Sequence, residues 1–497
     1  MIIRKMLFLQ KRENVMSNSL KILFNRLGLN NDNGLYLYKN KDKWKNLFPF
    51  RISRAIEKIK PYAFYAVKNE NNTTPLILFI DNTDNVDLKE LHLKLWNFQI
   101  PVIIIDNGNE WQVYNGYYLE NDKLEKLIEV VYYKKLDTGD KSDIDIFSFL
   151  NIISGNTWKQ FHNKLIEKGK RKKLDTYLLE NINETINILT KGEHAIKGKK
   201  NREIATNLIG RLIFIRYLID REVKLGFNNI SDNNSRKDFE NLILHKEELY
   251  ELFEYLKSKD KFNGNLFPFV DNEKNLIQKN HLQILYELFQ GRNLQNREQL
   301  DFISLFDIYD FNIIPVELIS NIYERFIGKE GQQITRSFYT PPFLVDYILK
   351  YTIEPHLENS DNCKVLDPSC GSGIFLVETL RKIIKKNIST GYLKTYDDLK
   401  QIAGNDNQLK QIVEDNDEKL RNIVKDNIFG IDKDTKAINV AIFSIYITIL
   451  DYKEPKEIEN FNLPMLDNNF IAENFIPHVN RANIISFKFF KLFIVRI

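Results

Sequence analysis

Cysteine is almost absent from this chain of 497 residues, which contains only Cys363 and Cys370. Two cysteines cannot build a disulfide framework, and such scarcity is typical of proteins of the reducing cytoplasm. No apolar run reaches the roughly 20 residues that a membrane-spanning helix needs. The 7 histidines and 2 cysteines also lack the spacing of a zinc site, and the chain has no internal repeat. The sequence therefore predicts a cytoplasmic protein with no membrane anchor and no metal ligands.

A large excess of charge of either sign is missing as well. The chain has 71 Lys and Arg against 67 Asp and Glu, which leaves a net charge of +4. This excess permits a nucleic-acid partner without requiring one. Hydrophobic residues make up 43% of the chain, which is typical of globular rather than disordered proteins. A chain of this length is too long for one hydrophobic core, so two to four domains are expected.

The most informative stretch is a turn with two glycines that follows a short apolar strand. It reads Val365-Leu366-Asp367-Pro368-Ser369-Cys370-Gly371-Ser372-Gly373. Pro368 ends the strand because it lacks an N–H group, while Gly371 and Gly373 permit a tight turn and the close approach of a ligand. Apolar residues then recur at helical spacing from Ile374 to Ile384. The pattern predicts a nucleotide-type ligand at the strand end, although a plain strand-to-helix turn would look the same.

The N-terminal part has the pattern of a mixed α/β module. Strands are expected at 75–81, 101–106 and 111–114, and a helix at 86–98. This order predicts a βαβ unit with a parallel strand pair. Magnesium-dependent nucleases use such scaffolds, with acidic residues that hold the metal and a lysine beside the attacking water. Here Asp81-Asn82-Thr83 lacks the lysine and Tyr62 stands where the first acid would lie, so the residues favour a structural module over a working nuclease.

The segment from 143 to 330 has a helical pattern. Helices are expected at 176–189, 204–223, 238–255 and 282–288. Two basic loops, at 168–173 and 197–202, interrupt this pattern. Each loop has two interpretations, contact with phosphates or plain solvation, and the second is favoured.

Two further segments accompany the glycine turn. Phe338-Tyr339-Thr340-Pro341 precedes it by roughly 25 residues and leads into a helix with proline in its first turn. Downstream, the strand pattern of Ile428-Phe429-Gly430-Ile431 ends at Asp432. Together the three segments resemble the adenine-specific DNA methyltransferases of restriction–modification systems. The resemblance is to large single-chain type II enzymes, which join a nuclease-like domain, a helical connector, a methyltransferase and a DNA-recognition domain. It is strong over residues 333–451 and weaker back to about 147.

The resemblance implies a fold, a cofactor and a partner. It implies a multi-domain α/β chain with a degenerate nuclease-like module at 1–142, a helical connector at 143–330 and part of a Rossmann-like class I methyltransferase at 331–497. The cofactor would be S-adenosylmethionine and the partner double-stranded DNA. The implied cofactor-binding residues are Tyr339, Thr340, Pro341, Asp367, Pro368, Gly371, Gly373 and Asp432. Asp432 would accept hydrogen bonds from the ribose hydroxyls, although a carboxylate there could also cap the helix expected from Thr435.

The motif that holds the target base in this family is absent. Adenine methylation needs Asn-Pro-Pro followed by an aromatic residue, and the only Pro-Pro here is Pro341-Pro342. No catalytic residue can therefore be assigned. We expect a C-terminally truncated member of the family that is inactive alone, with a complementary C-terminal polypeptide as a partner. An edge of the strand at 365–366 would then be unpaired unless a partner or the apolar tail covers it.

Three functions remain open at this point. The first is a DNA adenine-N6 methyltransferase. The second is an inactive S-adenosylmethionine-binding subunit or a pseudogene product. The third is an RNA methyltransferase, because some enzymes that act on ribosomal RNA share the glycine turn.

Overall fold

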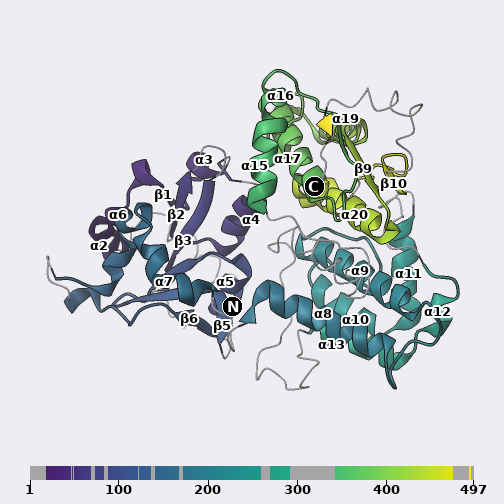
Figure 1. The fold of residues 1–497 in the computed structure, drawn as a ribbon, viewed down its shortest axis with the longest axis horizontal. Helices are drawn as coiled ribbons and strands as arrows, with labels where there is room; N and C mark the ends of the chain where they lie inside the picture. Colours follow the sequence, from purple (N-terminus) through teal and green to yellow (C-terminus); the bar gives the residue numbers. More distant parts are fainter. Residues whose placement is uncertain are drawn as a thin grey trace. The chain divides into compact units, whose positions relative to one another are not determined.

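In the computed structural model of the chain, the described residues are 18–45, 47–48, 50–68, 73–82, 88–120, 123–135, 140–166, 172–258, 269–290, 342–459, 461–473 and 492–493. The chain divides into two compact units between Leu178 and Leu179. Each unit is considered by itself, and Figure 1 shows their elements. The division does not coincide with the boundary expected at 142/143, because described residues up to Leu178 group with the first unit. Most of the expected helical connector and the whole of the expected methyltransferase segment belong to the second unit.

The first unit is built on a mixed sheet with the strand order β1-β2-β3-β4-β5-β6. Its strands are β1 (Leu35–Leu37), β2 (Ala63–Lys68), β3 (Thr73–Asp81), β4 (Val102–Asp106), β5 (Trp111–Glu120) and β6 (Lys123–Lys126), with β7 (Lys172–Lys173) beside β5. β3 and β4 run parallel, with Ile77 opposite Val102, and α5 (Leu88–Phe98) connects them. The expected βαβ unit is therefore confirmed.

Helices surround this sheet on a large apolar core. They are α2 (Asn18–Leu27), α3 (Lys41–Trp44), α4 (Phe50–Ile59), α6 (Phe149–Ile153) and α7 (Asn156–Ile166), while α8 (Leu174–Thr190) begins in this unit. Successive side chains of β2 to β4 point to opposite faces of the sheet, and most of them are buried on both faces, as their near-continuous apolar sequences predict. All four tryptophans of the chain, Trp44, Trp96, Trp111 and Trp158, belong to this unit.

The helical part of the second unit surrounds one buried helix, α9 (Asn201–Asp220). Its neighbours are α10 (Ser235–Ile243), α11 (Lys246–Lys257), α12 (Glu273–Leu276) and α13 (Lys279–Phe289). From Ile204 to Asp220 nearly every residue of α9 is buried, including Arg216, which pairs with Asp220 at 2.8 Å and Glu240 at 2.7 Å. The helical pattern expected at 238–255 is confirmed, but it forms two helices rather than one. The chain breaks at His245, whose extended backbone begins α11.

The C-terminal part of the second unit, where the methyltransferase is expected, contains a parallel sheet with the order β10-β9-β8-β11. Its strands are β8 (Val365–Asp367), β9 (Ile428–Asp432), β10 (Phe470–Ala472) and β11 (Leu492–Phe493). Its helices are α15 (Pro342–Thr352), α16 (Glu354–Glu358), α17 (Ile374–Ser389), α18 (Tyr396–Ile402), α19 (Asp406–Asn427), α20 (Thr435–Asp451) and α21 (Pro455–Ile458). The helices predicted after the glycine turn and after Asp432 are confirmed as α17 and α20.

The free edge expected beside β8 is paired in the structure. β11 runs parallel to β8, with Leu492 opposite Val365 and Phe493 opposite Leu366. The expected alternative, in which the apolar tail covers this edge, is the one observed. Within the described part of the chain, no helix combines the length and the hydrophobicity needed to cross a bilayer.

Candidate functional site

The glycine turn links β8 to α17 through a backbone that only glycine adopts readily. Gly371 has φ 54° and Gly373 has φ 82°, both in the left-handed region. The N–H of Gly373 donates to the carbonyl of Cys370 at 2.8 Å and closes the turn. Asp367, at the end of β8, is completely buried, and its Oδ1 accepts from the N–H of Ser369 at 3.1 Å. The Asp367 carboxylate therefore shapes the turn, and its expected contact with a cofactor ammonium stays a prediction.

The turn lies directly against α20. A Cβ atom built on Gly373 would lie 3.0 Å from the Cβ of Ala441 and 3.1 Å from its Cα. Contacts this short are rare between real side chains, so any residue larger than glycine must push α17 and α20 apart. The second glycine is thus required by its conformation and by its packing.

Asp432 joins the turn to the end of β9. Its Oδ2 accepts from the N–H of Gly371 at 2.9 Å, although the two residues are 61 positions apart in the sequence. Its Oδ1 accepts from the N–H of Asp434 at 3.0 Å, just before α20 begins. Asp432 thus links the turn to the residue just before α20, whereas a helix cap would need a bond to an N–H inside the helix, so that interpretation stays a prediction. Ribose binding stays a prediction, and it is compatible with this geometry because each carboxylate oxygen has a second lone pair.

Packing beneath the turn explains the neighbouring residues. A Cβ on Gly430 would lie 2.7 Å from the Phe470 ring and 3.0 Å from the sulfur of Cys370. Cys370 is completely buried, and its N–H donates to the carbonyl of Ile431 at 2.9 Å. These contacts fit the expectation that Cys370 is a small packing residue of the turn rather than a nucleophile.

Two buried asparagines fix β9 in the sheet, and sequence inspection did not identify either. The Oδ1 of Asn427 accepts from the N–H of Cys363 at 2.9 Å, and the amide of Asn469 donates to the carbonyl of Ile428 at 2.8 Å. The only available signal was a polar residue directly before an apolar strand. That position is common for turn residues as well, so it does not identify a buried amide.

The structure brings five of the eight expected site residues together. Asp367, Pro368, Gly371, Gly373 and Asp432 lie in one turn and the adjoining strand end. Pro368 is buried, while Gly371 and Asp432 are half-exposed and form the accessible rim. Tyr339, Thr340 and Pro341 lie outside the described residues, and α15 begins directly after them at Pro342.

Two strands of the first unit, β3 and β4, end in a carboxylate. Asp81 and Asp106 lie opposite each other at the ends of β3 and β4. Asp106 is completely buried and accepts from the hydroxyl of Ser19 and from the N–H of Gly108, the latter at 3.0 Å. Among the described residues, no group of three or more His, Cys, Asp or Glu could hold a metal ion. Whether the module is structural or a nuclease stays a prediction.

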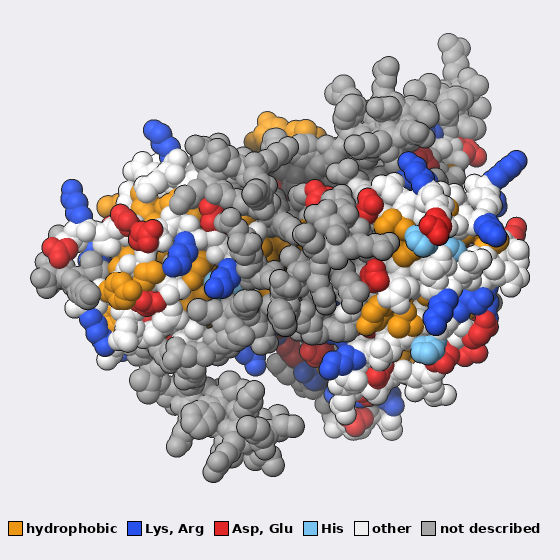
Figure 2. All heavy atoms as spheres, turned by 90° about the horizontal axis from the view of Figure 1, so that it is seen from below, with side chains coloured by type: hydrophobic (Ala, Val, Ile, Leu, Met, Phe, Trp, Pro, Cys, Tyr) orange, Lys and Arg blue, Asp and Glu red, His pale blue; other side chains and the backbone are white. Residues whose placement is uncertain are grey.

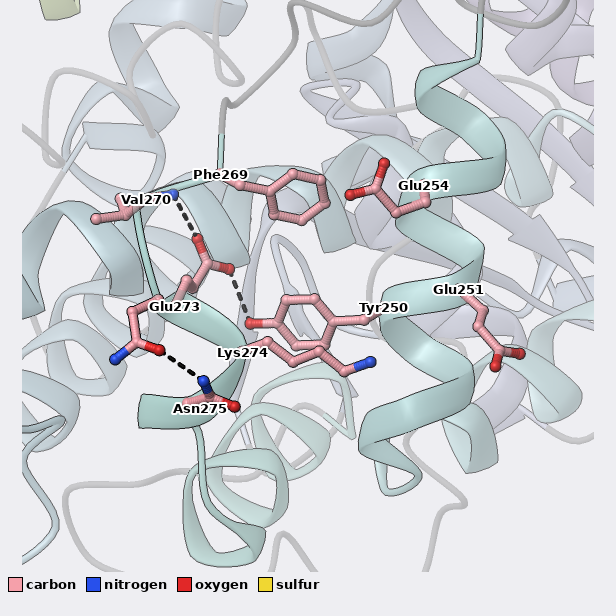
Figure 3. Close-up of a pocket in the computed structure, with 9 residues that line it drawn as sticks. Tyr250, Glu251, Glu254, Phe269, Val270, Glu273, Lys274 and Asn275 are labelled. Atoms are coloured by element: carbon pink, nitrogen blue, oxygen red, sulfur yellow. Dashed lines mark hydrogen bonds between the residues drawn. The ribbon is translucent and has the colours of Figure 1, made fainter.

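A cavity of about 370 Å³ opens in the helical part of the second unit. Figure 3 shows Glu273 inside it, where it accepts from the hydroxyl of Tyr250 at 2.8 Å and the N–H of Val270 at 3.1 Å. Arg211 also binds this carboxylate, so Glu273 already has protein partners on both oxygens. None of the residues that line the cavity belongs to the glycine turn or to β9. Among the described residues on the face drawn in Figure 2, Lys and Arg side chains are interspersed with Asp and Glu.

A family model matches the part of the second unit that contains the glycine turn. Residues 316–462 match the model of the family described as N-6 DNA Methylase. This segment is an N-6 DNA methylase domain by family. The match contains the glycine turn, Asp432 and the whole of α20. It leaves out most of the helical part and all of the first unit.

Two curated relatives extend the comparison beyond this domain. One is the type II restriction enzyme and methyltransferase RM.Eco57I of Escherichia coli, 24% identical over 349 residues that cover 64% of this chain and 31% of the relative. The other is RM.MjaORFECS2P of Methanocaldococcus jannaschii, 22% identical over 319 residues that cover 50% of this chain and 25% of the relative. The chain therefore spans a third or less of the length of these relatives.

Two solved structures of restriction enzymes are also similar. One is a DrdV–DNA complex, with a TM-score of 0.29 and 11% identity over 93% of this chain and 40% of that chain. The other is the type IIG restriction endonuclease BpuSI, with a TM-score of 0.30 and 12% identity over 88% of this chain and 43% of that chain. Scores this low support no inference about the present site.

Proposed function

We propose that the second unit binds S-adenosylmethionine at the glycine turn, and that it serves methylation of the adenine amino group in double-stranded DNA within a type II restriction–modification system. The observation that carries the proposal is the bond between Gly371 and Asp432. It places the backbone of the turn and a half-exposed carboxylate at the carboxyl ends of adjacent parallel strands, which is where nucleotide ligands bind in α/β sheets. The family match and the names of the curated relatives support the reaction and its DNA substrate. The proposed function places the protein in the cytoplasm, where the cell's DNA lies.

The residues around the turn fit this cofactor. Gly371 has no side chain, so a ligand can approach its backbone closely, and Asp432 offers acceptors for two ribose hydroxyls. Gly371 and Gly373 adopt the left-handed backbone that lets the chain turn tightly from β8 into α17. Tyr339, Thr340 and Pro341 would close over the methionine carboxylate. When it is bound, S-adenosylmethionine supplies the methyl group, and these residues orient it.

We further propose that the target base is held by residues outside these 497 residues. The sequence contains no Asn-Pro-Pro, the motif that accepts hydrogen bonds from the amino group of a flipped adenine in this family. A complementary polypeptide that carries this motif would supply that contact. A second candidate function follows from the same observation, namely that of a cofactor-binding subunit without methyltransferase activity.

The test combines cofactor binding with methyl transfer. Titration calorimetry of the full chain should detect binding of S-adenosylmethionine, and an analogue without the two ribose hydroxyls should bind at least roughly tenfold more weakly, since it loses two bonds to a carboxylate. Equal binding of the analogue would refute the role of Asp432, and no binding of either ligand would refute the site. Radiolabelled methyl transfer should be undetectable with duplex DNA and with RNA. Transfer to DNA by this chain alone would overturn the missing-base-site proposal, and transfer to RNA alone would establish an RNA methyltransferase.

A further inference from the structure

A buried hydrogen-bonded cluster joins the helical part to the methyltransferase part. Arg221 follows directly after α9, and Asp451 is the last residue of α20. The Nη1 of Arg221 lies 3.0 Å from Oδ1 of Asp451, and the hydroxyl of Tyr217 donates to the same oxygen at 3.0 Å. Arg221 also donates to the Tyr217 hydroxyl at 2.9 Å. The side chain of Arg221 is only 2% exposed, so water does not replace these bonds.

A second layer of the cluster reaches α19. The Nη2 of Arg221 donates to the carbonyl of Lys453 at 2.7 Å, while the ammonium of Lys453 pairs with the carboxylate of Asp417 and lies 3.6 Å from Glu457. The Lys453 and Asp417 side chains are 2% and 3% exposed. One arginine of the helical part thus holds the chain at the point where α20 ends, and the next residues are fixed from the other side by α19. Figure 1 shows α9 beside α20.

α20 is also the element that contacts both halves of the cofactor site. Near its middle, Ala441 packs against Gly373 of the turn. Just before its start, the N–H of Asp434 holds the carboxylate of Asp432. α20 has 17 residues, which corresponds to a rod of about 25 Å at 1.5 Å per residue. A shift or rotation at Asp451 is therefore transmitted along the helix to Gly373 and Asp432.

We infer that Tyr217 and Arg221 are positioning residues for the cofactor site, acting through α20. This inference rests on the function proposed for that site. Apolar residues of similar volume would stabilise this interface as well as the ion pair or better, because the desolvation of two buried charges offsets most of their attraction. Directional hydrogen bonds from one guanidinium to a carboxylate and a carbonyl do what apolar packing does not, since they fix the axial position and the rotation of the helix end. The helical part accordingly acts on the cofactor site through α20.

The chain offers a matched pair of tyrosines for the test. Tyr217 and Tyr250 are both buried in the helical part, each donates its hydroxyl to a carboxylate, and each lies beside an arginine. The carboxylate that accepts from Tyr217 is Asp451 of α20. The carboxylate that accepts from Tyr250 is Glu273, which belongs to the helical part itself. Tyr217→Phe should raise the Kd for S-adenosylmethionine by about tenfold, the effect of one lost bond to a charged group. Tyr250→Phe should change it less than about twofold while it lowers the unfolding temperature comparably.

A second measurement needs no ligand. Hydrogen exchange of the amides in 428–440 and 369–373 should be faster in Tyr217→Phe than in the wild type, and unchanged in Tyr250→Phe. Equal effects of the two variants on Kd and exchange would mean a general loss of stability and would overturn the inference. Unchanged Kd and exchange in Tyr217→Phe would overturn it as well. If the wild-type chain does not bind S-adenosylmethionine, the proposed function fails, and the exchange data alone decide whether Tyr217 positions α20.

Discussion

Replacement of Gly373 by alanine tests whether the close contact between the turn and α20 determines the stability of the second unit. An L-residue at the φ of 82° found at Gly373 costs on the order of 1–2 kcal/mol. The new Cβ would also lie 3.0 Å from the Cβ of Ala441, and overpacking of this kind costs about 1–3 kcal/mol. We therefore expect Gly373→Ala to lower the free energy of unfolding by about 2–5 kcal/mol.

Gly391, at the other end of α17, provides the control. Its φ is 77°, and a Cβ built there meets nothing within 4 Å. Gly391→Ala should therefore lose only the backbone contribution, about 1–2 kcal/mol. A double-mutant cycle with Ala441→Gly should show a favourable coupling of roughly 1 kcal/mol, because it removes one of the two crowding atoms.

The distribution of tryptophan gives the assay its resolution. Because all four tryptophans belong to the first unit, urea unfolding followed by their fluorescence reports on that unit. Far-UV circular dichroism also follows the helices of the second unit. Gly373→Ala should shift the dichroism transition to lower urea and leave the fluorescence transition in place. A loss no larger than that of Gly391→Ala would refute the claim that packing against Ala441 matters.

Three further predictions concern buried groups outside this contact. Burial, with a smaller contribution from the charge of Lys123, lowers the pKa of His92 to about 4. An unfolded histidine binds a proton below its ordinary pKa of about 6.5, so the first unit should lose roughly 2–3 kcal/mol of stability between pH 7 and pH 4.5 through this group. His92→Gln should remove that part of the dependence, measured by tryptophan fluorescence in urea, and identical pH profiles would contradict it. Asn427→Ala should cost about 1–3 kcal/mol in the dichroism transition, because it removes the buried bond to Cys363; a change below about 0.5 kcal/mol would show that this bond is replaceable. Gly430→Ala should destabilise the second unit because its Cβ would lie 2.7 Å from the Phe470 ring, and Phe470→Leu should restore part of the loss in thermal melts; no rescue would point to another cause.

Local patterns in the sequence predicted some elements of each sheet but did not predict β1, β2 or β6. Alternating and helical apolar patterns identified β3, α5, β4, α17 and α20, because each buries one face or stripe within a short stretch. The break between α10 and α11 was missed because Leu244 and His245 contain neither glycine nor proline. Arg221 and Asp451 are 230 positions apart, so nothing local indicated that the helical part joins the methyltransferase part. The proximity of Gly371 and Asp432 was expected from the family resemblance rather than from composition.

The two bonds of Asp432 decide how its role can be tested. Its carboxylate accepts from the N–H of Gly371 and from the N–H of Asp434. Asparagine at this position would present an NH₂ group to one of these donors, so Asp432→Asn would distort the turn or the start of α20 whether or not a ligand is bound. Loss of S-adenosylmethionine binding in that variant would therefore not show whether Asp432 binds the ribose or only shapes the turn and the start of α20. Removal of the hydroxyls from the ligand leaves both protein bonds in place. For this reason the ribose role is best tested with the analogue that lacks the two ribose hydroxyls. If the wild-type chain binds this analogue with the same Kd as S-adenosylmethionine, Asp432 serves the fold alone.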